Sequence, residues 1–214
     1  MEDLPKLLTS MQVGTDRIRE IMQSLRNFSR VDEAIGKPAD IHAGLESTLM
    51  ILHHRLKASV ERPAIELVKE YGELPLVECY TGQLNQVFMN IMANAIDAID
   101  EVMSKKIRGI NNRPERANYP LPKTRIHTEV INGEKVAIQI ADNGLGMPEK
   151  VRQRLFEPFF TTKPVGKGMG LGLSISYQIV VDKHGGQLSC ISAPGEGTKF
   201  MIEIPLKAAL SKVL

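Results

Sequence analysis

Four short segments of the chain combine polar, aromatic and glycine residues in patterns that could do chemistry. The first is a helical stretch in which Asn90 and Asn94 lie four residues apart, so both side chains stand on one face. Because an unpaired amide in a dry interior costs about 1–3 kcal/mol, both amides need partners. A bound cation together with phosphate oxygens would provide partners for both amides. Taken alone, however, this segment is better explained by two core asparagines that the protein itself satisfies.

The second segment runs from Asp142 to Pro148 and follows the apolar strand expected at residues 136–141. It leaves one carboxylate at the end of that strand, and Gly144 and Gly146 let the backbone pass close to a ligand. Such a carboxylate can accept a hydrogen bond from an exocyclic amine of the kind that adenine carries. A plain tight turn at Asn143 and Gly144 accounts for the same residues equally well.

The third segment is dense in aromatic residues. It gathers three of the six phenylalanines just before a threonine and a lysine: Phe156, Phe159, Phe160, Thr162 and Lys163. Aromatic residues this close together normally belong to a core. Here they lead into a stretch too rich in glycine to pack firmly, so the pattern favours an aromatic hinge that anchors a mobile flap.

The fourth segment is a glycine-rich loop that opens the last long helix. Its glycines alternate with other residues, at Gly166, Gly168, Gly170 and Gly172. The N–H groups and the positive dipole end of the following helix would bind phosphate, with Lys163 and Lys167 adding charge. Gly168 stands where a P-loop has Ser or Thr, and the spacing does not match a Rossmann fingerprint. Without the other three segments, a simple linker would be the better interpretation.

The elements that position these segments follow from hydrophobic periodicity and turn residues. Helices are expected at residues 44–56, 83–103 and 173–183, the last ended by Gly185 and Gly186. Strands are expected at residues 39–42, 65–71, 76–80, 125–131, 136–141, 187–192 and 198–204. Turns at Asn132-Gly133 and at residues 194–197 join the last four strands into two hairpins. Hairpins on one side and three helices on the other predict an α+β fold, a two-layer sandwich.

An apolar stripe precedes this domain. Its residues recur at alternating spacings of four and three: Leu4, Leu8, Met11, Thr15, Ile18, Met22 and Leu25. So strict a heptad favours a separate amphipathic helix made to pair with another helix, rather than one packed on its own domain. Gly36-Lys37-Pro38 breaks the pattern. The expected organisation is a helix over residues 1–34, a domain over residues 38–206 and a tail over residues 207–214.

Composition is that of an ordinary globular protein, with 43% hydrophobic and 24% charged residues. A net charge of +2 gives no reason to expect a nucleic-acid partner or a membrane surface. Cys79 and Cys190 lie in apolar runs far apart, which suits a reducing cytosol and predicts two buried thiols. The sequence has neither an apolar run of about 18 residues nor a signal peptide, so a soluble, cytoplasmic chain is expected.

Taken together and in this order, the four segments resemble the ATP-binding domain of bacterial two-component sensor histidine kinases, within the wider group of gyrase, Hsp90 and MutL. The resemblance covers residues from about 38 to 206. It rests on an asparagine box, a first glycine box, a phenylalanine box and a second glycine box: Asn90, Asn94 and Ala95; Asp142, Gly144 and Gly146; Phe156, Phe159 and Phe160; Gly168, Gly170 and Gly172. It implies a Bergerat-type fold, in which three helices cover one face of a mixed, mostly antiparallel sheet.

The same resemblance implies the roles of individual residues. Asp142 would bind the adenine amine, and Asn94, assisted by Asn90, would ligate Mg²⁺ at the catalytic centre. The other ATP contacts would come from a lid over residues 158–169 and from its surroundings: Gly144, Gly146, Phe160, Thr162, Lys163, Lys167, Gly168, Gly170, Leu171, Gly172, Leu173 and Thr198. The resembling ATPases carry Glu at the position of Asn90 as the base that activates water. An amide cannot accept a proton near neutral pH, so a kinase is favoured over a hydrolase.

Residues 1–33 resemble the second helix of the family's dimerisation and phosphotransfer bundle, whose first helix carries the phosphoacceptor histidine. None of the five histidines here lies in such a context, so the chain is expected to be a C-terminal piece of a sensor kinase. The resemblance then implies transfer of the γ-phosphoryl group of Mg-ATP to a histidine outside this chain. It also implies a response regulator as partner and a homodimer formed through the N-terminal helix. Two alternatives stay open, an ATP-gated interaction module without transfer and an ATPase-type clamp.

Overall fold

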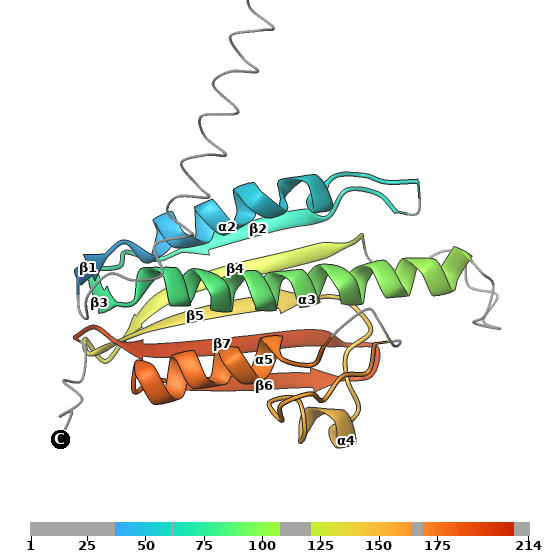
Figure 1. The fold of residues 1–214 in the computed structure, drawn as a ribbon. Helices are drawn as coiled ribbons and strands as arrows, with labels where there is room; N and C mark the ends of the chain where they lie inside the picture. Colours follow the sequence, from blue (N-terminus) through green and yellow to red (C-terminus); the bar gives the residue numbers. More distant parts are fainter. Residues whose placement is uncertain (1–36, 61, 108–120, 164–168, 208–214) are drawn as a thin grey trace, which may run out of the picture.

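A computed structural model describes residues 37–60, 62–107, 121–163 and 169–207 of the chain (Figure 1). The expected helix over residues 1–34, Lys167 and Gly168 of the glycine-rich loop, and the tail from residue 208 lie outside these residues. In the described ranges, no helix combines the length and the apolar character needed to cross a membrane.

Within the described residues, a five-stranded sheet in the order β2-β4-β5-β7-β6 forms one layer of the fold. Its strands are β2 (Glu66–Tyr71), β4 (Lys123–Ile131), β5 (Lys135–Asp142), β6 (Gln187–Ala193) and β7 (Gly197–Pro205). β2 runs parallel to β4, and the other neighbouring pairs are antiparallel. Asn132 and Gly133 join β4 to β5 with φ of 52° and 70°, the turn that an Asn-Gly pair predicts.

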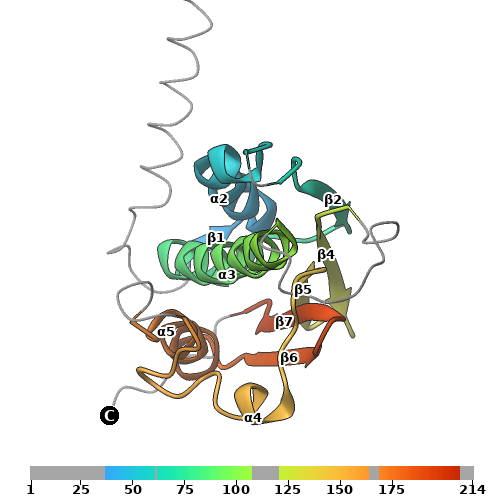
Figure 2. The same cartoon turned by 90° about the vertical axis from the view of Figure 1, so that its right-hand side faces the viewer.

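Helices on one side of this sheet form the second layer (Figure 2). They are α2 (Ile41–Leu56), α3 (Thr81–Ile107) and α5 (Gly172–Tyr177), which continues as the π-helical turn η1 (Gln178–Lys183). This arrangement confirms the expected two-layer α+β sandwich with a mixed, mostly antiparallel sheet. A short helix, α4 (Glu149–Arg152), follows the loop after β5, and β1 (Lys37–Ala39) pairs with β3 (Val77–Cys79) in a small separate sheet.

The core lies between α3 and the inner face of the sheet. Its fully buried side chains include Val87, Ile91 and Ile96 from α3 and Ile126, Ile138, Ile140, Ile202 and Ile204 from the strands. Each such side chain contributes about 1.5–3 kcal/mol by leaving water. Because this packing fixes α3 on the sheet, the polar residues at the edge of α3 hold a defined position relative to the end of β5.

One expected strand boundary and one expected burial need correction. The strand expected at residues 39–42 already ends at Ala39, the last residue of β1, because α2 begins at Ile41 and Asp40 caps it. The Asp40 Oδ1 accepts hydrogen bonds from the backbone N–H groups of His42, at 2.8 Å, and Ala43, at 3.3 Å. Cys79 is buried as expected, whereas Cys190 is only half-buried because β6 is an edge strand.

The last long helix ends as its paired glycines predict. Gly185 has a φ of 61°, and its N–H donates to the Val181 carbonyl at 3.1 Å. The Gly186 N–H donates to the Val180 carbonyl at 2.9 Å. These two hydrogen bonds close the helix and turn the chain directly into β6.

Candidate functional site

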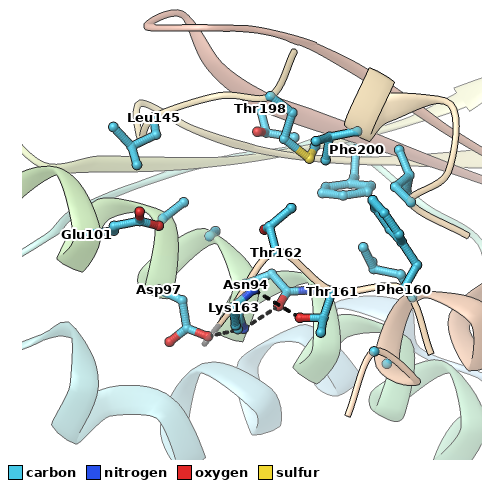
Figure 3. A pocket seen from close by; sticks show the side chains of 18 of the residues that line it. Asn94, Asp97, Glu101, Leu145, Phe160, Thr161, Thr162, Lys163, Thr198 and Phe200 are labelled. Atoms are coloured by element: carbon cyan, nitrogen blue, oxygen red, sulfur yellow. Dashed lines mark hydrogen bonds and ion pairs between the residues drawn. The ribbon is translucent and has the colours of Figure 1, made fainter. Parts of the chain in front are cut away.

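A cavity of about 380 Å³ is bordered by α3, the loop after β5, the beginning of β7 and the beginning of α5 (Figure 3). Its volume lies within the range of roughly 300–1,000 Å³ that ligand pockets occupy. Many of the residues expected at the site line it: Asn94, Asp142, Gly146, Phe160, Thr162, Lys163, Gly170, Leu171, Gly172, Leu173 and Thr198. Parts of all four chemical segments therefore meet at one place, although they are far apart in the sequence.

Asp142 ends β5 and presents a largely buried carboxylate to the cavity. Its Oδ1 accepts a hydrogen bond from the Gly144 N–H at 2.8 Å. Burial raises the pKa of Asp142 from 3.8 to about 6, although hydrogen bonds from the backbone of Gly144 and Thr198 act in the opposite direction. Thr198 stands opposite Asp142 in the ladder between β5 and β7. At neutral pH the site thus holds a desolvated anionic acceptor that a ligand's N–H donor would satisfy.

Glycines allow the loops around Asp142 to approach one another closely. Gly146 has a φ of 66°, and a Cβ there would lie 1.9 Å from the Ala193 carbonyl oxygen. Gly144 does not line the cavity. A Cβ on Gly144 would meet the Ala98 Cβ of α3 at 2.7 Å, so this glycine packs the loop against the helix.

The opposite wall of the cavity carries Asn94, on the half-buried edge of α3, and Lys163 (Figure 3). The Lys163 Nζ donates to the Asn94 Oδ1 at 3.1 Å and to the Asp97 Oδ2 at 2.5 Å. Arg55 of α2 donates to the Asp97 Oδ1, also at 2.5 Å. Burial by itself raises the pKa of Asp97, but the hydrogen bonds from Lys163 and Arg55 outweigh it and hold that pKa below its ordinary value. Asp97 is therefore an anion at neutral pH.

Asn90 lies one turn before Asn94 and faces α5 rather than the cavity. Its Nδ2 donates to the Gly172 carbonyl at 2.9 Å and to the Ser176 Oγ at 3.2 Å. Ser176 in turn donates to the same Gly172 carbonyl at 2.8 Å. Asn90 thus fixes the beginning of α5 against α3, and it is not among the residues that line the cavity.

The beginning of α5 borders the cavity through Leu171, Gly172 and Leu173. Gly170 precedes it with a φ of 67°, and a Cβ there would lie 2.7 Å from the Phe160 carbonyl oxygen. Gly170 is therefore packed directly on the backbone of the phenylalanine segment. The first N–H groups of a helix and its positive dipole end favour an anion at this point.

The three phenylalanines of the aromatic segment have different surroundings. Phe160 lines the cavity, and the Arg154 guanidinium lies 4.4 Å from its ring centre. Phe156 packs against Tyr177 of α5, with ring centres 5.2 Å apart. Phe159 is 73% exposed and has a φ of 65°. Phe160 alone of these three residues contributes to the cavity wall.

Part of the lining was not predicted from the sequence. The additional residues are Asp97, Ala98, Glu101, Leu145, Met147, Val151, Leu155 and Phe200, whereas Thr161 and Met169 fall within the expected lid. Helical spacing could have found some of them, because Ala98 and Glu101 lie four and seven residues after Asn94 on one face of α3. Phe200 shares a face of β7 with Thr198 by the period of two.

The donor set at Asn94 fits a magnesium ion that shares its ligands with phosphate. An amide oxygen and a carboxylate oxygen are the hard ligands that Mg²⁺ prefers, and the ammonium of Lys163 already contacts both. In the part of the chain that is described, no group of three or more His, Cys, Asp or Glu side chains could hold a metal ion. Mg²⁺ in nucleotide sites keeps few protein ligands, so one Asn and one Asp suffice.

The cavity is bordered by a helix that bears paired asparagines, by the turn after Asp142 at the end of a strand, and by a helix that begins with glycine. These are the features of a nucleotide-binding domain. The family model of histidine kinase-, DNA gyrase B- and HSP90-like ATPases matches residues 80–208, more than half of the chain. The chain belongs to this family.

Individual relatives narrow the comparison to sensor kinases. The sensor kinase CckA of Brucella abortus (strain 2308) is 32% identical over 200 residues, which are 92% of this chain and 20% of CckA. The histidine-protein kinase AtoS of Escherichia coli (strain K12) is 31% identical over 192 residues, 89% of this chain and 27% of AtoS. The chain thus spans about a quarter or less of the length of these relatives.

Solved structures agree with the fold. The nucleotide-free catalytic domain of the histidine kinase ThkA has a TM-score of 0.60 at 26% identity, and the match covers 79% of this chain and 97% of that domain. ThkA in complex with the response regulator TrrA has a TM-score of 0.60 at 22% identity, over 97% of this chain and 52% of that chain. At this identity the second likeness concerns the fold alone.

Proposed function

We propose that this domain binds Mg-ATP in the cavity and transfers the γ-phosphoryl group to a histidine outside the chain, as the catalytic domain of a two-component sensor histidine kinase. The observation that carries the proposal is the convergence of three different binding elements on one cavity. Asp142 offers a buried acceptor, Asn94 offers a metal ligand, and the beginning of α5 offers a phosphate site. The presence of sensor kinases among the relatives of this chain supports the same proposed function.

Each part of the nucleotide would occupy a different end of the cavity. Asp142 and Thr198 would bind the adenine amine, beside apolar side chains such as Leu145 and Met147. The phosphates would lie toward the beginning of α5, where the first backbone N–H groups have no hydrogen-bond partner within the helix. Lys163 would supply positive charge there. Asn94 would hold Mg²⁺, which when bound neutralises the charge that develops during phosphoryl transfer.

Catalysis of this kind consists mainly of positioning, and the residues around the cavity support that role. Asn90 cannot act as a general base, because its amide has no basic pKa near neutrality and its Nδ2 already donates to the Gly172 carbonyl. By bonding there, Asn90 would keep the phosphate site at a fixed position relative to Asn94. The absence of a base at this position favours a kinase over an ATPase.

The acceptor histidine must come from elsewhere. Among the residues that line the cavity, all of them described, none is a histidine. His184 is buried, its Nε2 accepts the Tyr80 N–H at 3.0 Å, and its Nδ1 pairs with the Ile179 carbonyl at 2.7 Å. Neither ring nitrogen is open to attack a phosphorus atom. His42 is likewise engaged, with its Nε2 at 2.9 Å from the Thr128 Oγ1.

The partners follow from the same proposal. The phosphoacceptor would lie in a helical bundle, and residues 1–34 would be the second helix of that bundle and the site of homodimerisation. A response regulator would then receive the phosphoryl group, as a kinase of this fold, ThkA, is found in complex with one. Such a relay would operate in the cytoplasm.

Radiolabelled ATP and a separately supplied bundle segment test the proposal. The segment should carry the phosphoacceptor histidine, and a matched segment with His→Gln serves as control. We expect acid-labile label on the first segment and none on the control or on the chain alone. ATP binding without labelled bundle would favour the interaction-module alternative, and steady phosphate release without transfer would favour the ATPase-type clamp. Label lost on changing one of the chain's own histidines would overturn the assignment of the acceptor to another segment.

A further inference from the structure

Lys163 contacts both an amide oxygen and a carboxylate oxygen in the proposed nucleotide site (Figure 3). Its Nζ lies 3.1 Å from the Asn94 Oδ1 and 2.5 Å from the Asp97 Oδ2. Both oxygens stand on α3, three residues apart, so they present one pair of ligands on one face of the helix. A single positive charge of this chain thus sits on the oxygens that a divalent cation would use.

Asp97 keeps its position through a second, independent contact. Arg55 of α2 donates to the Asp97 Oδ1 at 2.5 Å, and the same guanidinium lies 3.5 Å from the Asp100 Oδ2. Arg62 also pairs with Asp100. The carboxylate of Asp97 therefore stays fixed from the α2 side whether or not Lys163 is present. Lys163, by contrast, makes its contacts to α3 through the end of a long, rotatable side chain.

We propose, on the basis of the proposed function, that in the nucleotide-free protein Lys163 holds the place of the divalent cation, anchored by Asp97, whose carboxylate serves as a metal ligand once Lys163 has moved away. While Lys163 holds the Asn94 Oδ1, a free divalent cation is repelled from that position by the ammonium charge. Mg²⁺ therefore enters together with the nucleotide, whose phosphates give the displaced ammonium a new anionic partner. Lys163, held in place by Asp97, thereby keeps the metal site from filling before ATP arrives.

Manganese titration of the nucleotide-free chain tests this exchange without reference to activity. Mn²⁺ substitutes for Mg²⁺ at oxygen ligands, and its paramagnetism broadens nearby NMR signals, including the side-chain amide of Asn94. We expect little specific broadening in the wild-type chain. Lys163→Met should create a Mn²⁺ site next to Asn94 with an affinity at least tenfold higher than that of the wild type. Adding Asp97→Asn to Lys163→Met should abolish that site.

Matched substitutions separate this effect from a general loss of charge. Asp100→Asn removes a carboxylate one turn beyond Asp97 that pairs with arginine and does not line the cavity. Lys69→Met removes a lysine paired with Glu46 on α2. Neither change should alter Mn²⁺ broadening at Asn94. If Lys163→Met does not fold, Lys163→Gln removes the same charge with a polar side chain and carries the same expectation.

Two results would overturn the proposal. One is equal Mn²⁺ affinity at Asn94 in the wild type and in the Lys163 variant. The other is a Mn²⁺ site that persists unchanged when Asp97→Asn is added. ATP titration of the wild-type chain distinguishes these failures from failure of the proposed function. A chain that binds no ATP refutes the nucleotide site itself, whereas ATP binding with unchanged Mn²⁺ behaviour refutes only the resident cation.

Discussion

Replacing Asp142 with Asn should stabilise the nucleotide-free chain while it weakens ATP binding. Burial raises the pKa of this carboxyl from 3.8 to about 6. At about 1.4 kcal/mol per unit, the buried charge costs the folded state about 3 kcal/mol at neutral pH. Asn has the same shape and is never charged, and its oxygen can still accept the Gly144 N–H. The substitution should therefore recover part of this free energy.

The sign of the pH dependence follows from the direction of the shift. Because the pKa is higher in the folded state, protonated Asp142 is favoured by folding, and its contribution is fully present below pH 3.8. That contribution is lost as the pH rises through about 6. The stability gained by Asp142→Asn should thus be largest above pH 7 and shrink steadily as the pH falls toward 4.

Urea unfolding at several pH values between 4 and 8 measures this difference for the wild type and the variant. Calorimetry with ATP measures the second effect. Loss of a charge-assisted hydrogen bond to the adenine amine should cost about 1.5–3 kcal/mol, or roughly 10- to 150-fold in affinity. A stability difference that does not change with pH would refute the buried charge at Asp142. Equal ATP affinity in two folded proteins would remove Asp142 from the base pocket.

Three further predictions concern the loops, the metal ligand and helix α2. Gly146→Ala should destabilise the fold by more than about 2 kcal/mol in urea unfolding, because its Cβ would lie 1.9 Å from a carbonyl oxygen. Gly133→Ala, at a φ of 70° with nothing within 4 Å, should cost only about 1 kcal/mol. Asn94→Ala should remove the part of ATP affinity that depends on Mg²⁺ and leave metal-free binding largely intact, as calorimetry with and without the metal would show. Asp40→Ala should cost about 1 kcal/mol of stability through loss of the α2 cap, and an unchanged urea midpoint would contradict that role.

The parts of the site that sequence predicts are those with a local signal. Asp142 directly follows an apolar strand, and Asn94 sits on the polar edge of a strongly periodic helix, so each position can be inferred from its own element. The ion pair of Asp97 with Lys163 joins residues 66 positions apart, and no local pattern marks it. It depends on how the segment that ends at Lys163 lies against α3, which is a tertiary property.

Element boundaries show the same limit. Apolar and polar residues alternate over residues 39–42, as they do in a short strand. Asp40 can also cap a helix, and the burial of Ile41 and Leu45 in the core favours the helix. Helix α4 has only four residues and no periodic pattern of apolar side chains, so the sequence does not predict it. The turn of Asn90 toward α5 also depends on where the later helix lies. In each case two weak local preferences compete, and tertiary contacts select between them.

NMR mapping of ATP binding tests most directly the claim that nucleotide occupies this cavity with its base at β5 and its phosphates at α5. Backbone amide shifts recorded while Mg-ATP is added to the chain should concentrate at two places, around Asp142, Gly144 and Thr198, and around Gly172. Adenosine alone should shift the first group and leave the second nearly unchanged. Saturable shifts confined to the outer face of the sheet, around residues such as Arg125, would contradict the account, as would shifts at Gly172 that adenosine reproduces in full.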